Sequence, residues 1–199
     1  MKYEFFFGTM ILISVVNAQL VVDDFETGNL EPTIVTTETT NIHVQKGNTI
    51  IGKTRSIWIN PHENRFGQYF QTTITEGLWV VTTPYDTKGT FYLAYGKNTK
   101  VATTPLRLDL SQHTHLHIQF EAKSTVNGLY AIFFAGSSRA TYGKQLPASE
   151  SAFIVTIPLS DFKKIGPNYR LSQIDGIRFQ FDSRSKTGCS MAIDKIWFE

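Results

Sequence analysis

Intramolecular disulfide bonds are excluded, because Cys189 is the only cysteine among 199 residues. Stability must therefore come from packing, and Cys189 is predicted to be a small buried residue near the last strand rather than an intermolecular disulfide or a reactive thiol. An excess of one charge is missing too, since 19 Lys and Arg against 17 Asp and Glu leave a formal net charge of +2. This near balance argues against nucleic acid or an anionic membrane surface as a partner.

Long apolar runs are absent after the first residues of the chain. Phe5 to Val16 is the one such run, and it falls short of the roughly 20 residues that a membrane-spanning helix needs. Lys2 precedes it, and Val16-Asn17-Ala18 offers the small residues that a signal peptidase recognises. We therefore predict a signal peptide over 1–18, no membrane span, and a secreted, extracellular or periplasmic protein whose single domain occupies 19–199.

Helical periodicity is nearly absent, whereas β-branched and aromatic residues are frequent between Gly, Pro and Asn turn signals. Alternation of apolar and polar residues predicts half-buried strands over 116–123, 106–110 and 177–182. More uniformly apolar strands are predicted over 128–135, 153–157 and 91–95. A short helical turn is expected over 160–164, with Ser160 as its cap. The predicted fold class is all-β, with about nine or ten strands in the two sheets of a single antiparallel β-sandwich.

Common catalytic motifs are missing, since the chain has no Gly-x-Ser-x-Gly elbow, His-Glu-x-x-His pair or phosphate-binding loop. We therefore assign no catalytic residue. The sequence His113-Thr114-His115-Leu116-His117 is the sharpest enzymatic hint, because histidines two apart on a strand share a face and can hold a metal. A solvated polar face explains the same spacing more simply.

A polar face that alternates with core residues is the best candidate for binding. Its side chains lie on three predicted strands that we expect in one sheet, and they include Arg107, Asp109, His117, Gln119, Glu121, Arg178, Gln180 and Asp182. Sugar hydroxyls need such donors and acceptors, and an aromatic ring can stack on the apolar face of a pyranose. The aromatic candidates are Trp79, Tyr85, Tyr130 and Tyr142, whereas Trp58 and Trp197 are assigned to the core.

Acidic strand motifs stand near both ends of the predicted domain. Asp23-Asp24-Phe25-Glu26 follows the signal peptide, and Ile193-Asp194-Lys195 begins the last predicted strand. A closed sandwich would bring these two strands together. Carboxylates aligned in this way repel one another unless a cation or an arginine lies between them, or unless they are solvated.

Five phrases with this order and spacing resemble the galactose-binding-like jelly rolls, a group that includes many carbohydrate-binding modules: Asp23-Asp24-Phe25-Glu26, Leu108-Asp109-Leu110-Ser111, Ile157-Pro158-Leu159-Ser160-Asp161-Phe162, Ile174-Asp175-Gly176-Ile177 and Ala192-Ile193-Asp194-Lys195-Ile196. A second set, which includes 47–55 and 92–96, is similar to uncharacterised secreted bacterial proteins of the same sandwich type. The resemblance implies one structural Ca²⁺ between the first and last strands, held by Asp24, Glu26 and Asp194.

The sequence thus predicts a secreted, non-catalytic module that binds a glycan or another extracellular polymer. A structural or adhesion protein that meets another protein through a sheet edge is one alternative. A small polysaccharide hydrolase or lyase is the other, since Glu121, Asp109 and Asp182 would share a face if their strands were neighbours. The oligomeric state is left open.

Overall fold

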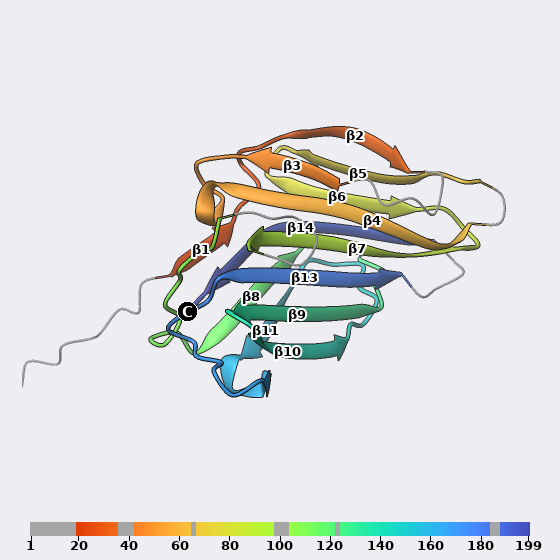
Figure 1. Ribbon diagram of the computed structural model, residues 1–199. Coiled ribbons are helices and arrows are strands. Elements are labelled where there is room, and N and C mark those ends of the chain that lie inside the picture. Colours follow the sequence, from red (N-terminus) through yellow and green to blue (C-terminus); the bar gives the residue numbers. More distant parts are fainter. Residues whose placement is uncertain (1–18, 36–41, 65–66, 98–103, 122–123, 184–187) are drawn as a thin grey trace, which may run out of the picture.

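The computed structural model describes residues 19–35, 42–64, 67–97, 104–121, 124–183 and 188–199, and the predicted signal peptide lies outside these ranges. The described chain forms two seven-stranded sheets, which confirms the predicted antiparallel β-sandwich (Figure 1). Within these ranges no helix has the length and apolar content that a membrane span requires.

The first sheet, sheet A, has the strand order β11-β8-β14-β6-β5-β2, with β1 paired to β14 beside this path. Its strands are β1 (Leu20–Asp23), β2 (Leu30–Val35), β5 (Phe70–Thr75), β6 (Leu78–Thr83), β8 (His115–Phe120), β11 (Phe153–Pro158) and β14 (Cys189–Phe198). Leu20 lies opposite Phe198 and Val21 opposite Trp197. The expected pairing of the first and last strands is therefore confirmed.

The second sheet, sheet B, has the order β12-β10-β9-β13-β7-β4-β3. Its strands are β3 (Ile42–Lys46), β4 (Thr54–Asn64), β7 (Thr87–Gly96), β9 (Gly128–Ala135), β10 (Ser138–Gln145), β12 (Lys163–Ile165) and β13 (Gly176–Ser183). Two short 3₁₀ turns complete the described elements, η1 (Ile51–Lys53) and η2 (Leu159–Asp161).

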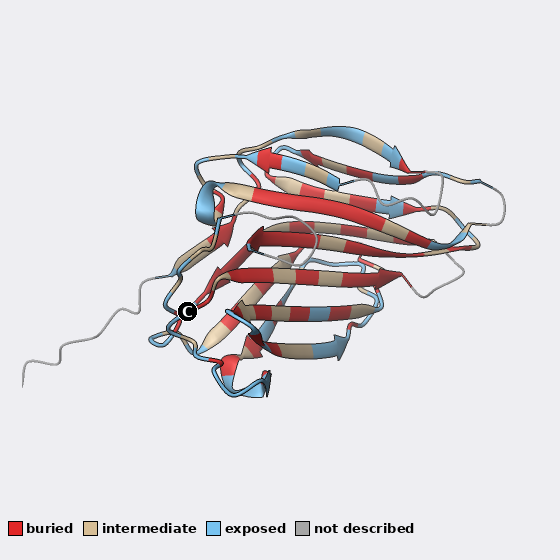
Figure 2. Cartoon of the chain, in the orientation of Figure 1, coloured by how far each residue is buried: buried red, intermediate tan, exposed pale blue. Residues whose placement is uncertain are grey.

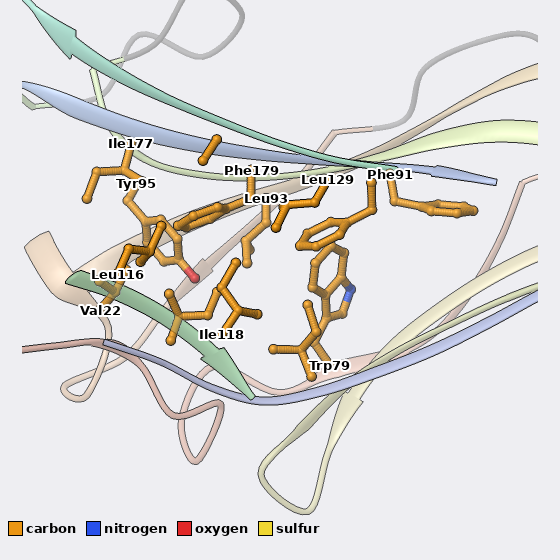
Figure 3. Close-up of a cluster of buried hydrophobic side chains, with 14 of the residues drawn as sticks. Val22, Trp79, Phe91, Leu93, Tyr95, Leu116, Ile118, Leu129, Ile177 and Phe179 are labelled. Carbon is orange, nitrogen blue, oxygen red and sulfur yellow. The ribbon is translucent and has the colours of Figure 1, made fainter. Parts of the chain in front are cut away.

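The core lies between the sheets and takes every second residue of the central strands, as the alternation of red and tan along them shows (Figure 2). Sheet A contributes Val22, Trp79, Leu116 and Ile118, and sheet B contributes residues such as Phe91, Leu129 and Phe179 (Figure 3). Each fully buried side chain of this size contributes about 1.5–3 kcal/mol. Cys189 is 4% exposed and burial raises the pKa of its thiol to about 12, as expected for a small core residue.

A buried ion pair crosses this core near the start of the chain. Arg55 and Asp23 are both fully buried, and Arg55 Nη1 donates to Asp23 Oδ1 at 2.8 Å and to Oδ2 at 2.9 Å. The Tyr95 hydroxyl donates to Oδ2 at 2.8 Å, and Arg55 Nη2 donates to the carbonyls of Thr27 and Gly28. The arginine thus joins β4 of sheet B to the chain that follows β1.

Two local predictions are wrong. The segment 106–110 is no regular strand, because only Leu108 forms a bridge, to Ile174. In place of the helical turn over 160–164, the chain forms a 3₁₀ turn over Leu159–Asp161. Ser160 lies inside this turn and does not cap it, and the chain then enters β12. Fourteen strands, β1 to β14, are described instead of the expected nine or ten.

Candidate functional site

One row of residues crosses the outer face of sheet B. The strand register places Trp58 opposite Tyr92, Tyr92 opposite Gln180, Gln180 opposite Tyr130, and Tyr130 opposite Gly143. Neighbours across paired strands point to the same face of a sheet. We call these five residues the aromatic row.

Tyr130 gives the row an exposed ring. Its side chain is 38% exposed, and a Cβ atom built on Gly143 would lie 2.8 Å from Tyr130 Cε1. The ring therefore lies over β10 at Gly143, which has no side chain. Gly143 leaves room for a flat apolar surface at the sheet.

The other end of the row is a stacked pair. The rings of Trp58 and Tyr92 lie 4.7 Å apart at an interplanar angle of 7°. Trp58 is fully buried, as expected, but the register places it on the outer face rather than between the sheets. Its Nε1 has no hydrogen-bond partner among the described residues. Burial raises the pKa of the Tyr92 hydroxyl.

A hydrogen-bonded network lies directly beside the row. Asp182 is 5% exposed, and its Oδ1 accepts from Thr90 Oγ1 at 3.0 Å and from Gln180 Nε2 at 3.2 Å. The Nε2 atom of His62 lies 2.7 Å from Thr90 Oγ1. These contacts orient the Gln180 amide and the Thr90 hydroxyl at the surface of the sheet.

Two hollows meet at Asp182. The larger, of about 560 Å³, is lined by His62, Lys88, Gly89, Thr90, Tyr92, Gln180, Asp182 and Ser183. The smaller, of about 200 Å³, is lined by Asn127, Gly128, Tyr130, Gly143, Lys144, Gln145 and Asp182. Because they share a residue and lie on one sheet face, we call them together the groove.

Only some of the predicted binding residues lie on this face. His117 and Gln119 lie on β8 of sheet A, and Glu121 follows that strand, whereas Arg178 and Tyr130 lie on sheet B. The expectation that their strands form one sheet is therefore wrong. The chain changes sheets between β8 and β9, and alternation within a strand does not reveal such a crossing.

The remaining candidates lie elsewhere. Tyr142 is opposite Ala131 on the core side of β10, and its ring lies 5.5 Å from that of Phe162. Arg107 and Asp109 are exposed in the irregular segment, where Arg107 lines a separate hollow of about 480 Å³. Their binding roles stay predictions.

The sequence analysis named Gln180 and Asp182 but missed other residues that line the groove, among them His62, Thr90 and Tyr92. The strand predicted over 91–95 contains Tyr92 but begins after Thr90, and it counts as nearly uniformly apolar because tyrosine is taken as hydrophobic. The alternation of Thr90 and Tyr92 with Phe91 and Leu93 was the available signal.

The histidine motif packs against the last strand on the outer face of sheet A. The ring of His117 stacks on Trp197 at 4.9 Å and 13°, and His117 Nε2 lies 3.4 Å from Glu199 Oε2. Burial lowers the pKa of His117. In the described chain no three or more His, Cys, Asp or Glu side chains gather as metal ligands would.

The carboxylates predicted for calcium have hydrogen bonds of their own. Asp24 Oδ1 accepts from the Glu26 amide at 3.1 Å, and Asp194 Oδ2 accepts from Gln119 Nε2 at 2.6 Å. Burial, and then the negative charge of Glu121, raise the pKa of Asp194. The described side chains form no cluster of three such ligands, and the structural Ca²⁺ stays a prediction.

The chain matches no family model and no curated protein. Among solved structures it is similar to a family 11 carbohydrate-binding module from Clostridium thermocellum in complex with a β-1,3-1,4-mixed-linked tetrasaccharide, with 14% identity, 90% of this chain and 94% of that chain covered, and a TM-score of 0.44. For a CBM4 structure the identity is 10%, 88% of this chain and 97% of that chain are covered, and the TM-score is 0.39. For PfGH50B the identity is 13%, 71% of this chain and 22% of that chain are covered, and the TM-score is 0.45.

Two of these solved structures are carbohydrate-binding modules, as are many members of the group that the five sequence phrases resemble. At such identities and TM-scores, the likeness assigns neither a ligand nor a function to this chain. The resemblance to uncharacterised secreted bacterial proteins stays a prediction.

Proposed function

We propose that the protein is an exported, non-catalytic glycan-binding module whose ligand lies in the groove on sheet B. The observation that carries this proposal is the exposed ring of Tyr130 beside the oriented polar groups of Gln180 and Asp182. A pyranose presents an apolar face to a ring and hydroxyls around its edge, so one sugar uses both features. The row continues to Tyr92, which gives room for a further sugar unit.

The small number of carboxylates in the groove supports binding rather than hydrolysis. Asp182 is the one carboxylate among the described residues that line the two hollows. Glycoside hydrolysis commonly needs two carboxylates, about 5–10 Å apart, on either side of the scissile bond. Asp182 itself is buried and accepts two hydrogen bonds, which suits the positioning of neighbours.

Removal of the exposed ring tests this proposal. Tyr130→Ala is expected to weaken binding to a polysaccharide at least about tenfold, as found for aromatic stacking on a ligand. The measurement is isothermal titration calorimetry with a polysaccharide that retards the protein in an affinity gel. Tyr69→Ala is the matched control, because Tyr69 is 65% exposed and lies outside the groove.

No retardation by any polysaccharide, or equal affinity of Tyr130→Ala and the unaltered protein, would contradict the proposal. Reducing ends released from the bound polysaccharide would show catalysis instead. Amino-terminal sequencing of the exported protein tests the predicted cleavage after Ala18.

A further inference from the structure

Positive charge gathers on the outer face of sheet B beside the groove. The register pairs Arg178 of β13 with Ile132, and Arg139 of β10 with Phe134, so the two arginines flank β9 from opposite sides. Lys163 of β12 lies opposite Thr141 on the same face. We call these three cations the basic end.

Arg178 is held in place at the edge of the groove. Its guanidinium lies 5.4 Å from the centre of the Phe134 ring, and the side chain is only partly exposed. Burial lowers the pKa of Arg178, the Tyr92 phenol raises it, and the positive charge of Arg139 lowers it again. Arg178 lies two residues before Gln180 on β13, and Gln180 is opposite Tyr92, so the charge is next to the aromatic row.

The two arginines repel one another, since each bears a full charge at neutral pH. An anion between them would relieve this repulsion. Arginine is suited to this role, because its planar fork donates paired hydrogen bonds to a carboxylate or a sulfate. A neutral sugar lacks such a group.

The other side of the aromatic row has the opposite character. Asp182 lies two residues beyond Gln180 along β13, whereas Arg178 lies two residues before it. Successive residues two apart on a strand point to one face, about 6.5–7 Å from each other. The hydroxyls and an anionic substituent of one bound sugar chain would therefore meet different groups.

We propose that the groove binds an acidic glycan, with a carboxylate or sulfate group held between Arg178 and Arg139. This inference rests on the proposed glycan function and names the class of ligand. The aromatic row receives the sugar ring, and the basic end selects for the charged substituent.

The test first compares acidic with neutral polysaccharides and then removes the charge from the backbone that binds. Alginate, polygalacturonate and chondroitin sulfate are compared with laminarin, barley β-glucan and galactomannan by affinity gel and calorimetry. We expect an acidic polysaccharide to bind, and its carboxyl-reduced or desulfated form to bind about tenfold or more weakly, the usual effect of losing a charge-assisted hydrogen bond.

Variants locate this selectivity. Arg178→Gln and Arg139→Gln are each expected to lower the affinity for the acidic form about tenfold while leaving the affinity for its neutralised form unchanged. Lys195→Gln removes the same charge from β14 of sheet A and is expected to change neither value. Circular dichroism confirms that each variant is folded.

The outcomes separate the two claims. Binding confined to neutral polysaccharides overturns the acidic ligand and leaves the proposed function in place. Absence of binding to every polysaccharide overturns the proposed function itself. If Lys195→Gln weakens acidic binding as much as Arg178→Gln does, the attraction is one of net charge, and the inference is wrong.

Discussion

Arg55 and Asp23 show how one buried contact bears on stability. Loss of the guanidinium in Arg55→Met leaves a buried carboxylate without its cation, which is expected to lower the free energy of unfolding by about 3–5 kcal/mol. Lys88→Met is the matched control, because it breaks the Lys88–Glu63 pair at the surface, where side chains are 31% and 45% exposed. Such a pair contributes about 1 kcal/mol or less. Urea denaturation measures both values.

The same variant has a predictable pH dependence. Burial already raises the pKa of Asp23, although the Arg55 charge lowers it, so removal of Arg55 raises this pKa further. A carboxyl with a raised pKa in the folded state binds its proton more tightly there than in the unfolded state. The deficit of Arg55→Met should therefore shrink as the pH falls from about 7 to about 4. A deficit that grows would contradict this assignment.

Gly143 acts on the groove through the ring of Tyr130. A methyl group in Gly143→Ala would lie 2.8 Å from Tyr130 Cε1, so the ring must move from its place over β10. We expect glycan affinity to fall several-fold, by about 1 kcal/mol, with the melting temperature nearly unchanged. In the Tyr130→Ala background the same substitution should have no further effect on affinity. Additive losses in calorimetry would show that Gly143 contacts the ligand independently.

Strands with clear alternation or a continuous apolar run were predictable from the sequence. The predictions over 128–135, 153–157 and 177–182 match β9, β11 and β13 within one residue at each end. The segment 106–110 failed although it alternates, because alternation reports exposure and does not require a hydrogen-bonded neighbour. The short β12, which is exposed throughout, has no such pattern to find.

The edge strand β3 exposes apolar side chains, and an adhesion protein would use this strand to contact another protein. Val44 is 50% exposed and Ile42 is 39% exposed. Val44→Lys is expected to reduce self-association in light scattering while changing the free energy of unfolding by less than about 0.5 kcal/mol. Val155→Lys, at a position only 6% exposed on β11, should instead destabilise strongly. Unchanged association of Val44→Lys would exclude β3 as an adhesive edge.

For the whole molecule, the sequence predicted the sandwich and the pairing of its terminal strands, but not the distribution of strands between sheets. A period of two tells which side of a strand is buried and says nothing about its neighbours. His117 and Arg178 alternate in the same way and lie on different sheets. The aromatic row therefore had to be found from the register, which unites Trp58, Tyr92 and Tyr130 from three strands.

The pairing of β1 with β14 brings the start and the end of the described chain together at one end of sheet A (Figure 1). A few added residues would close the chain into a ring, so that it could be reopened at another surface turn as a circular permutant. The groove belongs to the other sheet. Attachment to a bead or a carrier through either end should leave the same face open to a passing polymer.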